Sequence, residues 1–254
     1  MSSVSHSIFL LRSFGMWYCD DWLTGWKAKL YIVYTVFIFF VVYSFTLSHL
    51  LMLYAFINDA REFADASFVL LTCIATCGKM FNMISKRKTI GALLRTVQEG
   101  LFRPRDSEEF AINDESIHRT RLYTCLAGVL AELSCTLLTV LSLARDFPRR
   151  ELTHEAWLPF STATPVAYTI AFLHQIYARY IVASINIGFD CLIPGIMIIT
   201  STQLAIFKHR VRKIHDVVEH ARNSYNDTFH LKDKVYMEQK LIGSCVEHHC
   251  AIFQ

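Results

Sequence analysis

The stretch LYIVYTVFIFFVVYSFTLSHLLMLYAFIN, residues 30–58, decides the fold, because its 29 residues contain no Asp, Glu, Lys or Arg. A helix needs about 20 predominantly apolar residues to cross the hydrocarbon core of a bilayer. The strands and helices of water-soluble domains rarely need an uncharged run of this length. Residues 30–58 therefore predict a membrane-spanning helix.

Four further blocks share this character, namely 66–85, 122–144, 156–178 and 180–207. The five blocks together contain only three charged residues, Lys79, Glu132 and Asp190. The composition excludes other classes. A chain with 53% hydrophobic residues is not disordered, and eight Cys in 254 residues are too sparse for a disulfide scaffold. A net charge of +3 is too small for a nucleic-acid binder. We therefore expect an all-α, multi-pass membrane protein.

The last two blocks are better explained by one long helix than by two. Only Arg179 separates them, whereas two antiparallel helices need a connection of at least about two residues. Pro159 and Pro165 interrupt the early part of the first block. We predict an outer segment without helix over 145–166 and a single span over 167–207. The predicted spans are then four, at 30–58, 66–85, 122–144 and 167–207.

The distribution of Lys and Arg predicts the orientation of these spans. With a cytosolic N-terminus, the segments on the cytosolic side (1–29, 86–121 and 208–254) hold 19 Lys and Arg, and the outer ones hold four. This agrees with the excess of positive charge on cytoplasmic loops. Residues 1–29 carry charges of both signs and do not resemble a secretory signal. The sequon Asn226-Asp227-Thr228 is then cytosolic, and we expect it to carry no glycan.

Two of the cytosolic segments show helical spacing. Apolar residues recur at Ile90, Leu93, Leu94, Val97 and Leu101, which predicts an interfacial helix that continues from the second span. A weaker stripe follows in 208–254, at Leu231, Val235, Ile242 and Val246. Residues 1–29 are expected to be cytosolic or interfacial.

Catalytic motifs are missing from the sequence. It contains no G-x-S-x-G, P-loop, G-x-G-x-x-G or H-E-x-x-H, and it has only nine glycines. A possible metal cluster is formed by Cys245, Glu247, His248, His249 and Cys250. It is poorly suited to a metal, because adjacent histidines on a helix point about 100° apart. We expect no enzyme activity, no metal and no cofactor.

The three charges inside the apolar blocks are the best local clue to a site. At 1.5 Å per residue, Lys79 and Glu132 lie roughly 20 and 18 Å below the outer ends of their spans, and Asp190 lies roughly 17 Å below Arg179. Charges in spans usually face the bundle interior and find partners there. We predict that Lys79 pairs with Asp190 or with Glu132 and that Asn186 joins this network. Its role is either a structural clamp or part of a gating element.

The outer halves of the second, third and fourth spans carry apolar and aromatic residues with a few hydroxyl groups. Such a combination suits a pocket for a small apolar ligand, although ordinary helix packing or lipid contact would produce the same pattern. The candidate pocket residues are Phe68, Leu71, Thr72, Ser134, Leu138, Leu141, Phe172, Ile176 and Tyr180.

Several short stretches resemble those of one known family, the insect odorant receptors. The resemblance rests on their order and spacing along nearly the whole chain. They are Leu10-Leu11-Arg12 through Gly15-Met16-Trp17, Leu70-Leu71-Thr72-Cys73-Ile74 to Lys79-Met80, Trp157-Leu158-Pro159-Phe160 leading to His174-Gln175, Asn186-Ile187-Gly188-Phe189-Asp190, and Cys245-Val246-Glu247-His248-His249.

The resemblance implies a seven-span subunit of a ligand-gated cation channel with a cytosolic N-terminus. The chain would then be the N-terminal part of such a receptor, without spans 5–7. It implies an odorant pocket among spans 2, 3, 4 and 6, a pore lined by the last span, and a hetero-tetramer with a co-receptor subunit. Small volatile odorants and membrane lipid are the implied partners, nucleic acid is not, and the implied location is the cell membrane of a sensory dendrite.

Two alternatives remain open from the sequence. The first is a subunit of the related gustatory receptors, which the Trp157-Leu158-Pro159-Phe160 stretch and the His248-His249 pair disfavour. The second is a four-span membrane fragment that does not conduct, such as a scaffold or part of a transporter. A transporter would show paired, broken spans in two halves, and only the fourth helix has a Pro-Gly break, at Pro194-Gly195.

Overall fold

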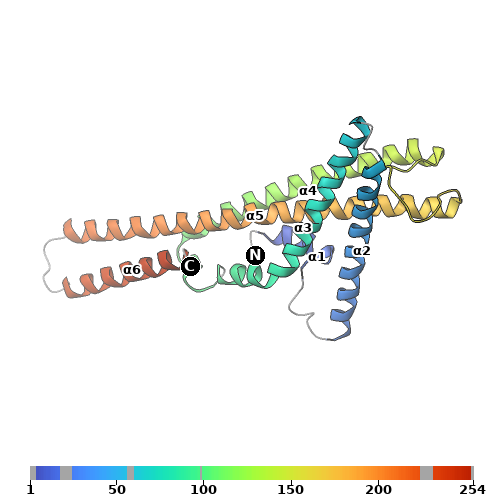
Figure 1. The fold of residues 1–254 in the computed structure, drawn as a ribbon. Helices are drawn as coiled ribbons and strands as arrows, with labels where there is room; N and C mark the ends of the chain where they lie inside the picture. The colour runs from blue at the N-terminus through green and yellow to red at the C-terminus, as the bar shows by residue number, and fades with distance from the viewer. Residues whose placement is uncertain (1–3, 18–24, 56–59, 98, 224–230, 253–254) are drawn as a thin grey trace. The chain divides into compact units, whose positions relative to one another are not determined.

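The computed structural model describes residues 4–17, 25–55, 60–97, 99–223 and 231–252. These residues contain helices and no strand (Figure 1). The elements are α1 (Ser5–Ser13), α2 (Trp26–Ala55), α3 (Ala60–Thr96), the 3-10 helix η2 (Gly100–Phe102), α4 (Ser107–Arg149), α5 (Pro165–Asn223) and α6 (Leu231–Ile252). The predicted all-α class is confirmed.

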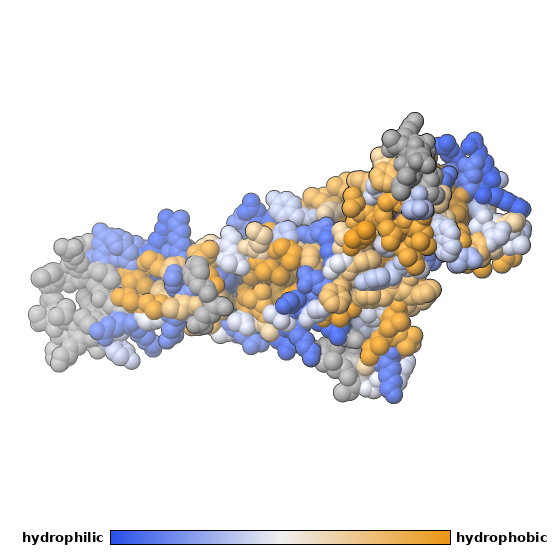
Figure 2. All heavy atoms as spheres, viewed as in Figure 1, coloured by the Kyte–Doolittle hydropathy of each residue, from blue (hydrophilic) through white to orange (hydrophobic). Residues whose placement is uncertain are grey.

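Four of these helices, α2, α3, α4 and α5, are long and apolar enough to cross a membrane. Each contains one of the predicted spans, and the single long helix expected after residue 167 is α5. The last residues of the first predicted span, 56–58, lie outside the described residues. Much of the apolar surface of these helices is exposed, as the hydrophobic residues that gather over α2 and α3 in Figure 2 illustrate. Such a surface is typical of helices that face lipid.

The predicted non-helical segment 145–166 is too long at both ends. Helix α4 continues to Arg149 and ends at Arg150, which has a left-handed φ of 56°. Helix α5 already begins at Pro165. Proline fits the first turn of a helix, where its missing N–H has no intrahelical acceptor, and the Thr164 hydroxyl accepts from the Ala167 N–H at 3.3 Å. Between α4 and α5, residues 150–164 lack regular α-helix.

The segment 86–121 is also more helical than the predicted loop with one interfacial helix. Helix α3 runs on to Thr96, as expected, but α4 begins at Ser107, well before its apolar block. The Asp106 carboxylate explains this start, because it accepts from the Glu109 N–H at 2.9 Å as a helix N-cap does. Capping of this kind allows a polar stretch to be helical without apolar periodicity.

The described chain divides into two compact units, which we describe separately. Unit 2 comprises residues 5–87 and 123–192, and unit 1 comprises residues 1–4, 88–122 and 193–254. In unit 2 the end of α1 is held by hydroxyl groups of α2. The Tyr31 hydroxyl donates to the Arg12 and Trp17 carbonyls, at 3.0 and 2.6 Å, and the Thr35 hydroxyl donates to the Gly15 carbonyl at 3.0 Å.

Helix α5 supplies much of the core of unit 2. Its buried residues include Phe172, Ile181 and Ile185, and α1 packs against it through Leu11. A methyl group on Gly188 would lie only 3.0 Å from the Leu11 side chain, so the absence of a side chain there allows the close approach. The core of unit 2 is therefore built around the helix that carries Asn186 and Asp190.

Candidate functional site

A polar network inside unit 2 joins α3 to α5. The Lys79 ammonium donates to the Asp190 carboxylate at 2.6 Å and to the Asn186 Oδ1 at 2.8 Å. The Asn186 amide in turn donates to the Thr76 hydroxyl at 2.6 Å. Residues 76 and 79, like residues 186 and 190, are three or four positions apart and so share a helix face. Each helix thus presents two polar groups to the other.

Of the two acids that the sequence leaves open as partners of Lys79, the structure places Asp190 beside it. Glu132 of α4 instead accepts a hydrogen bond from the Ser184 hydroxyl of α5 at 2.5 Å. One turn further along α4, the Thr136 hydroxyl accepts from Tyr180 at 3.1 Å. Two separate polar connections therefore hold α5, one to α3 and the other to α4.

The nine candidate pocket residues divide into an exposed and a buried group. The six on α3 and α4 are all exposed, with 76% for Phe68, 66% for Leu71, 52% for Leu138 and 57% for Leu141. Thr72 and Ser134 are exposed as well. On α5, Phe172 is fully buried, whereas Ile176 and Tyr180 are half-buried. The six exposed side chains leave the outer halves of α3 and α4 open for contact.

Phe172 belongs to an aromatic cluster at the outer end of unit 2. Its ring lies 5.3 Å from that of Phe147 and 5.8 Å from that of Tyr168, measured between ring centroids. The Tyr168 hydroxyl donates to the Glu151 carbonyl at 3.0 Å. Phe172 therefore anchors α5 to the end of α4, and the sequence prediction of a pocket wall did not anticipate this packing.

A histidine-rich cluster, which the sequence reasoning did not single out, fixes the outer segment 150–164. The Gln175 side chain of α5 accepts from the His154 N–H at 3.2 Å and donates to the His154 carbonyl at 2.8 Å. The His154 ring lies 5.8 Å from that of His49. Burial, and next the nearby guanidinium of Arg179, lower the pKa of His154 to about 4. His154 is therefore neutral at physiological pH.

Among the described residues, the most completely buried ion pair lies in unit 1. Arg210 of α5 donates through Nε and Nη2 to the two carboxylate oxygens of Glu109 on α4, both at 2.8 Å, and the side chains are 7% and 2% exposed. The same guanidinium donates to the Leu101 and Arg103 carbonyls at 2.9 and 3.1 Å. Because it satisfies four acceptors, Arg210 connects α4, α5 and the segment around η2.

His248 brings α6 to the same connection. It is fully buried, and its ring lies between those of Phe102 and Phe207, at 5.4 and 6.0 Å. Its Nδ1 lies 3.2 Å from Nη1 of Arg210, which can only donate, and its Nε2 lies 3.3 Å from the Gln203 Oε1. Nδ1 therefore accepts and Nε2–H donates. Burial and the Arg210 charge lower the pKa of His248 to about 4.

Three possible metal ligands meet in unit 1, but they are already paired with basic side chains or with one another. The ligand atoms of Asp106, Glu109 and His209 lie within 4.8 Å of one another. Glu109 is bound by Arg210, and Asp106 is bound by Lys213 at 3.0 Å and His209 at 3.1 Å. The Glu109 N–H, followed by Lys213 and His209, lowers the pKa of the Asp106 carboxyl. This arrangement is an ion-pair network at the start of α4.

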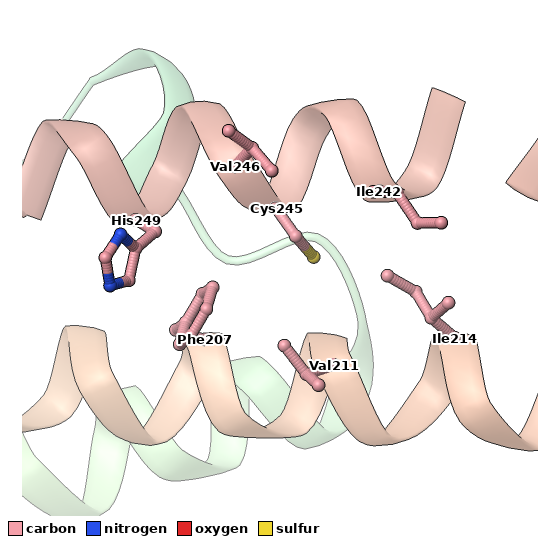
Figure 3. A pocket seen from close by; sticks show the side chains of 7 residues that line it. All are labelled: Phe207, Val211, Ile214, Ile242, Cys245, Val246 and His249. Carbon is pink, nitrogen blue, oxygen red and sulfur yellow. The ribbon is translucent and has the colours of Figure 1, made fainter. Parts of the chain in front are cut away.

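Unit 1 also contains an apolar groove between α5 and α6. The groove encloses a cavity of about 320 Å³. Figure 3 shows the side chains of both helices that point toward one another across it. Ile242 and Val246, from the predicted weak stripe of the last segment, are part of its lining. Its lining residues are Phe207, Val211, Ile214, Ile242, Cys245, Val246 and His249. Burial raises the pKa of the Cys245 thiol, so this cysteine is not activated as a nucleophile.

These features define a class of protein, a multi-pass helical membrane protein with polar connections between its spans. The family model described as "7tm Odorant receptor" matches residues 59–254, so the chain belongs to the family of seven-transmembrane odorant receptors. Among the curated proteins, odorant receptor 46a, isoform A, of Drosophila melanogaster is 26% identical over 189 residues, which are 74% of this chain and 49% of that protein. Odorant receptor Or1 of Anopheles gambiae is 24% identical over 199 residues, 78% of this chain and 45% of that protein. The chain thus spans about half the length of these relatives.

Solved structures share the fold of this chain. The insect olfactory receptor OR5 from Machilis hrabei superimposes with a TM-score of 0.77 at 14% identity and covers 98% of this chain and 62% of its own. The same receptor in complex with eugenol gives a TM-score of 0.69 at 15% identity, over 98% of this chain and 64% of its own. The family match, together with this shared fold, confirms the resemblance to odorant receptors seen in the sequence.

Proposed function

We propose that this chain is part of an odorant receptor subunit that binds small, apolar, volatile ligands between its spans. In the complete subunit, together with a co-receptor, ligand binding gates a cation channel in the membrane of an olfactory neuron. Membership of the odorant receptor family supports this proposal, as does the relative from Machilis hrabei whose structure is described in complex with eugenol.

The observation that carries the proposal is the open apolar surface on the outer halves of α3 and α4. Phe68, Leu71, Leu138 and Leu141 are all more than half exposed there. Burial of apolar surface contributes roughly 25 cal/mol per Å², so a small odorant that covers these side chains gains affinity without a charge. Tyr180 of α5 adds a hydroxyl group at the depth of Thr136. Such a surface suits ligands with one or two hydrogen-bonding groups.

Gating follows if the ligand has different affinities for two states of the receptor. A ligand that binds the open state more tightly shifts the population toward it, by no more than its differential affinity. We assign the network of Lys79, Asn186 and Asp190 the role of a clamp that keeps α3 against α5 while the pocket fills. The exposed side chain of Asp190, at 61%, leaves this network accessible to further segments of the receptor.

The test is functional expression of the receptor from its complete transcript together with an insect odorant co-receptor. We expect a subset of a volatile panel to raise intracellular calcium. Leu138→Ala is expected to raise the half-maximal concentration of these volatiles several-fold, by about 1–2 kcal/mol of lost apolar contact. The control is Phe40→Ala on α2, which removes another exposed apolar side chain away from the candidate pocket. Absence of a response to every volatile, despite surface expression, would show that the proposed function is wrong.

A further inference from the structure

Arg179 of α5 carries a buried positive charge for which the described residues offer no hydrogen-bond acceptor. Its Nε, Nη1 and Nη2 are all enclosed, and none of them donates to any residue in the described part of the chain. A guanidinium has five N–H donors and stays protonated, so it cannot relieve the cost of burial by losing its charge. By contrast, the intramembrane Lys79 and the buried Arg210 both have partners.

The neighbours of Arg179 do not neutralise it. The titratable groups around it are Cys135 and Asp146 of α4, Tyr180 of α5 and His154 of the outer segment. Asp146 is the only acid among them and is beyond hydrogen-bonding distance. His154 is neutral at physiological pH because its pKa is about 4. The surroundings therefore hold one positive charge without a bound counter-ion.

This charge lies among the candidate pocket residues. Arg179 and Tyr180 follow Ile176 by three and four positions, so both lie next to Ile176 on the surface of α5. Cys135, next to Ser134, approaches it from α4. Because the guanidinium nitrogens are enclosed, a ligand reaches them only when the outer halves of α4 and α5 separate to admit it.

We propose that Arg179 binds the carboxylate of small carboxylic acid ligands and makes the candidate pocket selective for acids over neutral compounds of the same skeleton. A carboxylate supplies both the missing charge and two acceptors that match the planar fork of a guanidinium. An alcohol or a hydrocarbon supplies neither. This inference rests on the proposed function, because it assigns a ligand class to the same pocket.

A matched ligand series of one carbon skeleton tests this assignment: a carboxylic acid, its methyl ester, the corresponding alcohol and the hydrocarbon. Each is applied to cells that express the receptor from its complete transcript with a co-receptor. We expect the acid to be the most potent member. Arg179→Gln is expected to raise its half-maximal concentration about tenfold or more and to shift the alcohol and hydrocarbon by less than about threefold.

Two further variants make the test specific. Arg179→Lys keeps the charge but loses the bidentate geometry, so it should weaken the response to the acid less than Arg179→Gln does. Arg145→Gln removes an exposed charge from the outer end of α4 and should change nothing. Surface labelling establishes that each variant reaches the membrane. If Arg179→Gln does not reach the membrane, two other results test the proposal: the order of potency of the four ligands at the wild-type receptor, and the response of Arg179→Lys to the acid.

The failures of the two proposals are distinguishable. A wild-type receptor that responds to neutral members as strongly as to the acid would overturn the role of Arg179 and leave the proposed function intact. Equal shifts for all four ligands in Arg179→Gln would overturn it too, because they indicate a partner for Arg179 within the protein. If no member of this series or of a broad volatile panel evokes a response, the proposed function itself is wrong.

Discussion

Lys79 shows how a single charge inside an apolar block determines local packing. A lysine in the hydrocarbon region is stable only if its ammonium is paired or reaches water. In unit 2 it is paired with Asp190 and Asn186, and its Nζ also lies 5.8 Å from the centre of the Phe189 ring. The contribution of this contact is moderate, because polar contacts between membrane helices average about 0.6 kcal/mol.

A double-mutant cycle of Lys79→Met and Asp190→Asn measures this pairing. We expect the two residues to be coupled by roughly 0.5–1.5 kcal/mol in the free energy of unfolding in detergent, since each variant leaves the other group without its partner. Lys79→Met combined with Glu132→Gln serves as the control and should be additive, because Glu132 is bonded to Ser184. Coupling to Glu132 without coupling to Asp190 would contradict the network.

At the scale of the elements, α4, α5 and α6 are held together in unit 1 by buried polar groups rather than by apolar contacts alone. Arg210 and Glu109 join α5 to the start of α4, and His248 adds α6 through Arg210 and Gln203. A buried ion pair contributes little net stability compared with an apolar pair of the same shape, but removal of one partner leaves a buried charge alone. The connection is therefore specific in geometry and sensitive to single substitutions.

Arg210→Met is expected to destabilise unit 1 by about 3–5 kcal/mol, because Glu109 then remains buried without its cation. The double variant Arg210→Met with Glu109→Gln should recover part of this loss, since it removes the second charge. The control is Lys213→Met. The side chain of Lys213 is 60% exposed and its amino group binds Asp106, so we expect this change to cost less than about 1 kcal/mol. Protease resistance of α6 and the unfolding midpoint in detergent measure these effects. A milder effect for Arg210→Met than for Lys213→Met would refute this assignment.

His248 predicts that the attachment of α6 weakens in acid. Its pKa is about 4 in the folded chain and near 6.5 in an unfolded one, so the unfolded state binds the extra proton first as the pH falls. Stability is therefore constant above pH 6.5 and decreases between pH 6.5 and pH 4, by roughly 1 kcal/mol at pH 5.5. Arg210, Arg105 and Glu109 are the charges that face this histidine.

Amide hydrogen exchange of α6 at pH 7 and pH 5.5 measures this loss of stability, and His248→Gln should remove its pH dependence. An equal pH dependence in that variant would assign the effect to another group.

For the whole molecule, the main prediction is the orientation of the four spans. The charge distribution predicts that residues 150–164 face the outside and that 97–106 and 208–254 face the cytosol. The structure supplies four helices of sufficient length and apolar character, but a helix bundle has the same internal contacts in either orientation. The orientation therefore remains a prediction from charge.

Glycosylation tests this orientation directly. Phe160→Asn creates the sequon Asn-Ser-Thr in the outer segment, where residue 160 is 45% exposed, and we expect a glycan there. Asp114→Asn creates the sequon Asn-Glu-Ser at 114–116, on the predicted cytosolic side, and this site should remain unmodified. The native sequon Asn226-Asp227-Thr228, which lies outside the described residues, should remain unmodified as well. A mobility shift that is lost on deglycosylation identifies the modified protein. Modification at 114 or 226, with none at 160, would reverse the topology.

The sequence by itself determined the class of the protein, the number of its long apolar helices and the fusion of two blocks into α5. Uncharged length and the position of prolines are sufficient for this, because the bilayer allows only closed hydrogen-bonded segments to cross it. The short stretches around Leu70, Trp157 and Asn186 were sufficient to indicate the family, which the comparisons confirmed. Helix ends were less certain, since they depend on single caps such as those of Asp106 and Thr164.

Only the tertiary structure decided which groups meet. Apolar blocks rich in Leu, Ile and Phe do not specify the rotation of each helix about its axis. This rotation places Asp190 rather than Glu132 beside Lys79. It also buries Phe172 and leaves Phe68 exposed. The same holds for contacts between residues distant in sequence, such as Arg210 with Glu109 and His248 in unit 1. The enclosure of Arg179 without an acceptor is likewise a property of the packed helices, because its burial depends on atoms supplied by α4 and the outer segment.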